Sequence, residues 1–194
     1  PMLFMAQEFA AAAPFAFFAD HDRQLAVEVR RGRGDFMKQF VHYATPEAQA
    51  RLLDPTAVQT FVRSKLDFAD RERHARTLAL HQDLLALRRN DAVISRQDRD
   101  CIDGAVLSEH AFVLRWFGGA QGERLLLVNF GSELELRPMP EPLLGPPRDA
   151  RWECLWSSAA AKYGGPGMVD PLGSLPWRLP AESASLPRSM TEPR

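Results

Sequence analysis

A continuous apolar run at the start of the chain, Met2 to Met5, passes directly into the polar pair Gln7 and Glu8. Apolar runs of this length are typical of a strand buried on both faces, as in a parallel sheet covered by helices. Polar side chains at the carboxyl end of such a strand occupy the place where α/β barrels hold ligand-binding groups. A parallel strand needs neighbours to satisfy its backbone donors and acceptors. We therefore expect residues 2–5 to be one strand of a larger barrel whose earlier strands precede this sequence.

The next segment is a phenylalanine-rich loop that ends in an acidic residue and a histidine. The two segments resemble the last barrel strand and the following loop of malto-oligosyltrehalose trehalohydrolases, a family of glycoside hydrolases in the alpha-amylase superfamily. The matching residues are Pro1, Leu3, Phe4, Met5 and Glu8 in the strand, and Pro14, Phe15, Phe17, Phe18, Asp20 and His21 in the loop. Ala6 stands where the family pattern has glycine. The resemblance continues through residues 78–89 and 156–167, so it extends over most of the chain.

This resemblance implies that the intact protein is a retaining glycoside hydrolase that releases trehalose from malto-oligosyltrehalose. Glycoside hydrolysis uses two carboxyl groups that flank the scissile bond. In the family these groups come from earlier barrel strands, so we expect no catalytic residue in this chain and no activity from it alone. The chain would contribute one wall of the sugar site, and its partners would be a malto-oligosaccharide-type substrate and the missing N-terminal part of the same enzyme.

Six residues are candidates for that wall. Aromatic rings stack on the apolar faces of glucose, while carboxylate, amide and imidazole groups bond its hydroxyls. On this basis the predicted substrate-binding residues are Gln7, Glu8, Phe15, Phe17, Asp20 and His21. The alternative is that the phenylalanines belong to a hydrophobic core and that Glu8 is a structural hydrogen-bond acceptor.

The composition excludes several other classes of function. The chain has 194 residues and a formal net charge of −1, which gives no electrostatic attraction for nucleic acid. It has no apolar stretch of membrane-spanning length, so we expect no membrane contact and a cytoplasmic location. Cys101 and Cys154 do not have the spacing of a metal site, and two free thiols, without metal or cofactor, are the expectation.

Helical patterns dominate the first half of the chain. A helix is expected from Asp22 to Phe40, with Asp22 as its cap, and two further helix starts are expected at Thr45-Pro46 and Asp54-Pro55. A longer helix is expected from Asp67 or Asp70 to Arg89, with Asn90 as a left-handed terminator. Its leucines would cover the strand at residues 2–5.

Alternating patterns follow in the second half. Strands are expected over 111–117, 124–130, 133–137 and 151–156, with a type II′ hairpin turn at Gly131-Ser132 between the second and third. The predicted fold class is therefore multidomain α+β, the C-terminal end of a (β/α)8 barrel followed by a small antiparallel β-sandwich. The predicted domains are residues 1–92 for the barrel part with its helical excursion and 93–194 for the sandwich.

Two other functions remain open from the sequence. A glycogen branching or debranching relative would share the strand motif but not the loop. A non-catalytic carbohydrate-binding or interaction module is the second alternative, and Trp152, Trp156 and Trp177 could form its sugar platform, although tryptophans of a sandwich more often lie in the core.

Overall fold

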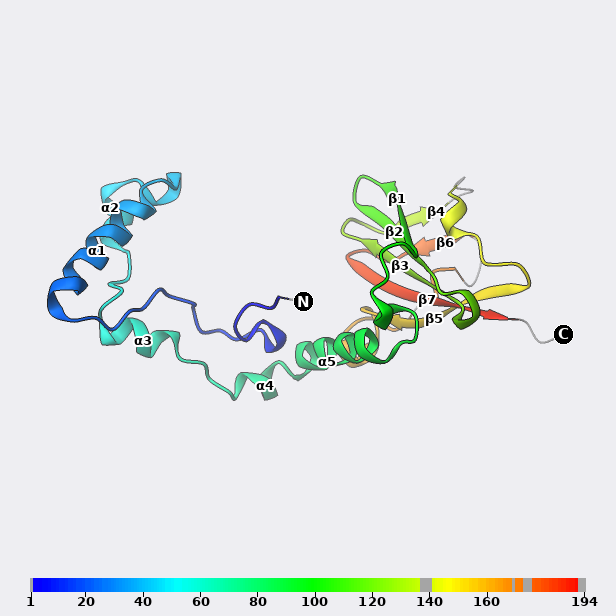
Figure 1. Cartoon of the computed structure of the whole chain (residues 1–194), viewed down its shortest axis with the longest axis horizontal. Coiled ribbons are helices and arrows are strands. Elements are labelled where there is room, and N and C mark those ends of the chain that lie inside the picture. Colours follow the sequence, from blue (N-terminus) through cyan, green and yellow to red (C-terminus); the bar gives the residue numbers. More distant parts are fainter. Residues whose placement is uncertain (1, 137–140, 169, 173–175, 192–194) are drawn as a thin grey trace. The chain divides into compact units, whose positions relative to one another are not determined.

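The computed structural model describes residues 2–136, 141–168, 170–172 and 176–191 (Figure 1). It contains two compact units, an N-terminal unit of Pro1–Ala75 and a β unit of Arg76–Arg194. The domain boundary expected after residue 92 stays a prediction. Among the helices of the described residues, none combines the length and the apolarity needed to cross a membrane.

The N-terminal unit contains short helices joined by irregular segments. In chain order these are η1 (Gln7–Phe9), α1 (Arg23–Met37), η2 (Val41–Tyr43), α2 (Pro46–Ala50), α3 (Val58–Ser64) and α4 (Asp70–Arg73). The predicted cap of α1 is confirmed, because the Asp22 carboxylate accepts from the amides of Gln24 at 2.9 Å and Leu25 at 3.1 Å. These bonds satisfy two of the four amides that a helix start leaves unpaired.

The second predicted helix start is confirmed and the third is wrong. Thr45 caps α2 through the amide of Ala48, with Pro46 at the first helical position. Asp54 instead accepts from the amide and the hydroxyl of Thr56, at 2.9 and 2.8 Å. This closes a local turn, which competes with a helix start, and α3 begins only at Val58.

Residues 2–5 do not form a strand in this chain, so the barrel strand expected there stays a prediction for the whole protein. These residues are irregular, and their side chains are between 41% and 98% exposed. No strand of the N-terminal unit's described residues is available to pair with them. Ala6, which follows, has a φ of 60° in the left-handed region, a conformation that glycine adopts without the steric penalty of a Cβ.

The long predicted helix is divided at His74. Its second part, α5 (Ala75–Asn90), lies against the sheet of the β unit (Figure 1). The predicted left-handed terminator is wrong, because Asn90 is the last helical residue and no positive φ occurs there. The helix was expected to cover a strand at residues 2–5 that does not form. Leu84 and Leu87 instead line a cavity of about 160 Å³ with Trp116, Leu126, Trp156 and Leu186 of the sheet.

The β unit has two antiparallel sheets. The larger has the strand order β1 (Ile102–Ser108), β2 (Ala111–Phe117), β3 (Glu123–Asn129), β7 (Ser183–Thr191), β5 (Ala150–Ser157), and the smaller pairs β4 (Leu134–Leu136) with β6 (Trp177–Leu179). Short helical turns η3 (Ile94–Arg96), η4 (Gly119–Gln121), η5 (Pro142–Leu144) and η6 (Ala161–Tyr163) lie in the connections. The predicted antiparallel β region is therefore present, and the strands expected over 111–117, 124–130 and 151–156 are confirmed to within one residue at each end.

The hydrophobic core of the β unit lies between these two sheets. Val113 and Leu125 of the larger sheet are fully buried and share one cluster with Leu136 and Leu179 of the smaller sheet. Trp152 belongs to the same cluster and donates its indole N–H to the carbonyl of Leu144 at 2.8 Å. Burial of this ring with its polar atom satisfied favours the core interpretation of Trp152 over a sugar platform.

The predicted hairpin at Gly131-Ser132 is wrong, since β3 and β4 belong to different sheets. The buried Asn129 side chain stabilises the connection from β3 in the larger sheet to β4 in the smaller sheet. Its amide nitrogen donates to the carbonyls of Ser132, Leu179 and Pro180, and its oxygen accepts from the amide of Gly131. The two N–H groups of this amide are thus shared among three carbonyls, and its oxygen binds a fourth backbone group, where the chain leaves one sheet for the other.

β7 continues to Thr191 and lies between β3 and β5 in the larger sheet. Pro187 lies within it, although proline cannot donate to a ladder. The ladder is interrupted at this point, because the register between β5 and β7 shifts between Cys154 and Trp156. This bulge in β5 accommodates Pro187 of β7. It also interrupts the alternation of side chains predicted for β5. As a result, Trp156 lies beside α5 and outside the core cluster.

A buried ion pair ties the end of α5 to the sheet. The Asp91 carboxylate accepts from Arg124 Nε of β3 at 2.9 Å, and the side chains are only 7% and 11% exposed. The same carboxylate accepts from the amides of Val93 and Ile94. Burial alone would raise the pKa of Asp91, but these two amides and the guanidinium outweigh it and leave the pKa below its ordinary value.

We expect Asp91→Asn to destabilise the β unit by about 3–5 kcal/mol, because the amide can still accept from the two backbone amides but leaves Arg124 buried and uncompensated. Urea unfolding followed by tryptophan fluorescence measures this, since all four tryptophans lie in the β unit. The matched control is Glu133→Gln, which breaks an exposed pair with Arg178 and should cost less than about 1 kcal/mol. Equal losses in the two variants would contradict the role assigned to Asp91.

Candidate functional site

The segment that carries most of the predicted site residues, loop 10–21, is held in the N-terminal unit by three backbone amides. Ala12 donates to the Asp70 carboxylate at 3.1 Å, Ala16 to the Ser64 hydroxyl at 3.4 Å, and Ala19 to the carbonyl of Pro55 at 2.8 Å. The partners come from α3, α4 and the connection before α3, so the short helices act as the scaffold of the loop.

Asp70 is buried, and its side chain is 3% exposed. It also accepts from Arg73 at 2.8 Å. The Ala12 amide and the Arg73 guanidinium together outweigh burial and lower the pKa of Asp70 below its ordinary 3.8. The carboxylate is therefore ionised at neutral pH, and its charge is used to hold the loop.

Two of the predicted residues, Phe15 and Phe17, lie together in a groove of about 240 Å³. The two residues are 62% and 49% exposed. The groove is also lined by Tyr43, Arg33 and Arg51, and the Arg33 guanidinium lies 5.3 Å from the centre of the Phe17 ring. Phe18 differs, since it is half-buried and packs on Phe61 at 5.3 Å. The structure thus brings three aromatic rings and two guanidinium groups to one surface, which suits contact with sugar faces and hydroxyls.

The other predicted residues do not line this groove. Gln7 accepts from the amide of Phe4 at 3.1 Å and is exposed, while the neighbouring Glu8 is half-buried in η1. Asp20 and His21 are exposed at the end of the loop, just before the cap of α1. Arg33, Tyr43 and Arg51 were missed from the sequence, because their approach to the loop depends on how α1 and η2 pack, which no local pattern records.

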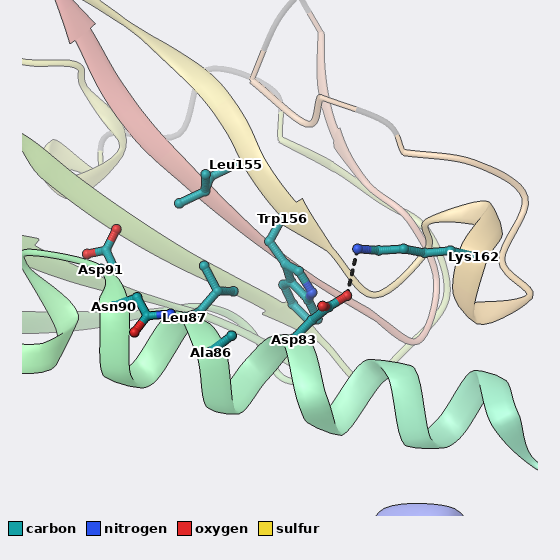
Figure 2. A pocket seen from close by; sticks show the side chains of 8 residues that line it. All are labelled: Asp83, Ala86, Leu87, Asn90, Asp91, Leu155, Trp156 and Lys162. Atoms are coloured by element: carbon teal, nitrogen blue, oxygen red, sulfur yellow. Dashed lines mark ion pairs between the residues drawn. The ribbon is translucent and has the colours of Figure 1, made fainter. Parts of the chain in front are cut away.

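A second concave site occurs in the β unit, between α5 and the end of β5. Its volume is about 370 Å³, and we call it the α5 cavity (Figure 2). One wall is apolar and consists of Ala86 and Leu87 of the helix with Leu155 and Trp156 of the strand. Polar side chains complete the lining, namely Asp83, Asn90, Asp91 and Lys162.

The polar side chains at one end of the α5 cavity form a connected chain of hydrogen bonds. Lys162 Nζ lies 2.6 Å from the Asp83 carboxylate, an ion pair marked by the dashed line in Figure 2. The Tyr163 hydroxyl donates to the same carboxylate at 2.5 Å. The Trp156 indole donates to the Tyr163 hydroxyl at 3.0 Å. The bond from Lys162 and that from Tyr163 lower the pKa of Asp83, and the bond to Asp83 raises the pKa of Lys162. Both groups are charged at neutral pH.

The glycine-rich segment after Tyr163 makes this arrangement possible. Gly164 has a φ of +92°, and a Cβ at Gly165 would lie 2.1 Å from the carbonyl oxygen of Ala159. The chain can turn this tightly only with glycine at these positions. The turn presents Lys162 and Tyr163 to Asp83 of α5.

The remaining candidate groups have local partners. His74 Nδ1 lies 2.9 Å from the carbonyl of Phe9, and His81 Nδ1 lies 2.9 Å from that of Thr77. Both cysteines are free, and burial raises the pKa of Cys154 to about 11. Within the described ranges, no three histidine, cysteine or acidic side chains are placed so that they could hold a metal ion.

Comparison with known sequences identifies one domain family and several curated relatives. The family described as a domain of unknown function, DUF3459, matches residues 102–186, which lie within the β unit. This family is the C-terminal domain of alpha-amylase family enzymes.

Three curated relatives of this chain share the name malto-oligosyltrehalose trehalohydrolase. A malto-oligosyltrehalose trehalohydrolase of Deinococcus radiodurans is 42% identical over 139 residues, which is 69% of this chain and 22% of the relative. The enzyme of that name from Mycobacterium tuberculosis is 31% identical over 146 residues, 74% of this chain and 24% of the relative. That of Rhizobium sp. is 36% identical over 137 residues, 68% of this chain and 21% of the relative.

The chain spans between a fifth and a quarter of the length of these relatives. The predicted relationship to malto-oligosyltrehalose trehalohydrolases is confirmed. It was made from the motifs at residues 1–8, 14–21, 78–89 and 156–167.

We expect Asp70→Ala to release loop 10–21, because the Ala12 amide and Arg73 lose their shared partner. Hydrogen exchange at pH 6 should show faster exchange for the amides of residues 10–16 and little change in β3 or β7. The matched control is Asp35→Ala, which breaks an exposed pair with Lys38. Unchanged protection of residues 10–16 in Asp70→Ala would contradict the scaffold role of Asp70.

Acid should have the same effect on the wild-type chain. The pKa of Asp70 is lower in the folded state than its ordinary value of 3.8, which applies to the unfolded chain. Its contribution is therefore fully present above that value and is lost as the pH falls through the lower folded pKa.

Proposed function

We propose that the protein to which this chain belongs is a glycoside hydrolase that releases trehalose from malto-oligosyltrehalose. The observation that carries the proposal is the identity of 31–42% with curated enzymes of that name over about 70% of this chain. The 139 aligned residues of the Deinococcus relative exceed the length of the β unit, Arg76–Arg194, so more than a common C-terminal domain supports the assignment.

Residues 2–5 would form a barrel strand in the whole protein. The exposure of four consecutive apolar residues supports this proposal. A strand between two neighbouring strands would bury these side chains and pair their backbone groups. The left-handed φ of Ala6 would end the strand and turn Gln7 and Glu8 towards the mouth of the barrel.

Loop 10–21 would contribute one wall of the substrate site. Phe15 and Phe17 would stack on glucose rings, and Asp20, His21, Gln7 and Glu8 would bond hydroxyl groups. Exposure of both phenylalanine rings in the groove with Tyr43 supports a contact role over a core role in this chain. A branching or debranching enzyme gains no support from the curated relatives, which carry the trehalohydrolase name.

The isolated 194-residue chain should not hydrolyse malto-oligosyltrehalose, since the resemblance assigns the two reacting carboxyl groups to earlier strands of the barrel. The measurement is released trehalose after incubation of the purified chain with this substrate. Release above that of a mock preparation, abolished by Glu8→Gln or Asp20→Asn, would contradict the proposal that the reacting groups lie elsewhere.

In the whole enzyme, we expect Asp20→Ala and His21→Ala to lower kcat/KM between a few-fold and about a hundredfold, the range for losing one hydrogen bond to a neutral or a charged group. Their melting temperatures should stay at the wild-type value, because both side chains are exposed. Asp35→Ala and His42→Ala are the matched controls, as exposed residues of the same unit outside the loop. If the two loop variants and the two controls all keep the wild-type kcat/KM, loop 10–21 has a structural role and does not bind substrate.

A further inference from the structure

We propose that the α5 cavity is a binding site for a neutral sugar, one or two glucosyl units in size. This inference concerns the β unit alone and does not rest on the activity proposed above. It rests on three properties of the cavity, which are its size, its division into an apolar wall and a polar rim, and its charge balance.

The size and the apolar wall suit a pyranose ring. A volume of about 370 Å³ is at the small end of ligand sites. Ala86 and Leu87 face Leu155 and Trp156 across it, and in Figure 2 the Trp156 ring extends from β5 towards the helix. A pyranose has an apolar C–H face that contacts such a wall, and it keeps its hydroxyl groups at the edge.

The charges of the rim cancel, which argues against an ionic ligand. Asp83 is paired with Lys162 at 2.6 Å and Asp91 with Arg124 at 2.9 Å. An anion would compete with Asp83 for Lys162, and a cation would compete with Lys162 for Asp83. A neutral hydroxyl group can bond a paired carboxylate and ammonium without separating them, since both retain free donor or acceptor sites.

The rim is also preorganised. Asp83 is oriented by Lys162 and by the Tyr163 hydroxyl, which is itself fixed by the Trp156 indole. At the other end of the cavity, Asn90 presents an exposed amide with both donors and an acceptor. Groups already held by neighbours lose little rotational freedom when a ligand binds.

The test uses the full 194-residue chain, labelled with ¹⁵N, and the indole N–H signals of its four tryptophans. Tyr163→Phe identifies the Trp156 signal, because it removes the acceptor of that N–H. Titration with maltotriose should shift the Trp156 signal in a saturable way with a Kd in the millimolar range. Sorbitol, a polyol without a pyranose face, should leave the signal in place.

Two pairs of variants locate the site. Asn90→Ala should raise the Kd about two- to tenfold, the equivalent of one neutral hydrogen bond, and Gln82→Ala, an exposed residue of α5 outside the lining, should not change it. Lys162→Met should raise the Kd similarly, while Arg178→Met, which breaks a comparably exposed pair in β6, should have no effect.

Three outcomes would overturn the proposal. They are no saturable shift of the Trp156 signal with maltotriose, an equal shift with sorbitol, and an unchanged Kd in Asn90→Ala and Lys162→Met. None of them would affect the proposed hydrolase activity, which is measured as trehalose release by the whole enzyme. Loss of that activity would in turn leave sugar binding by the β unit intact.

Discussion

The pairing of Asp91 with Arg124 determines where the end of α5 meets the larger sheet. Charges this well buried are tolerated only when they are paired and hydrogen-bonded, so the position of the helix end is set within narrow limits. One turn and two turns earlier, Leu87 and Leu84 then reach the sheet side chains Trp116, Leu126 and Leu186. Asp83 reaches Lys162 and Tyr163 from the same helix. Both the packing of α5 on the sheet and the α5 cavity depend on this placement.

The sequence correctly predicted the features that depend on interactions between residues close together in the chain. The caps at Asp22 and Thr45, the strand at Ala111–Phe117 and the glycine turn after Tyr163 each depend on residues close in the chain. The errors concern long-range partners. The hairpin at Gly131 failed because Asn129 bonds the carbonyls of Leu179 and Pro180, fifty residues away in sequence. The strand β7 was not predicted, because Pro187 and several serines interrupt the apolar alternation that indicates a strand. The proline fits in the sheet because β5 has a bulge opposite it.

The candidate sites show the same division. The phenylalanines of loop 10–21 were evident from the sequence, whereas Arg33, Tyr43 and Arg51 join them only through the packing of the N-terminal unit. In the β unit, Trp156 was one of three tryptophans considered for a sugar platform, and the structure separates it from Trp152. Trp152 lies in the core between the sheets, while Trp156 borders the α5 cavity. Asp83 and Lys162 lie 79 positions apart in the printed sequence, so their pairing could not be inferred from spacing.

The central structural claim is that α5 belongs to the cooperative unit of the sheet. Native-state hydrogen exchange of the whole chain tests it directly, because it measures the free energy of opening for each amide. The amides of residues 80–89 in α5 should open with the same free energy as those of β3 and β7, and Asp91→Asn should lower all of these values together. If instead the α5 amides exchange with the lower protection of α1 and α3 while β3 and β7 remain protected, the helix does not belong to that unit.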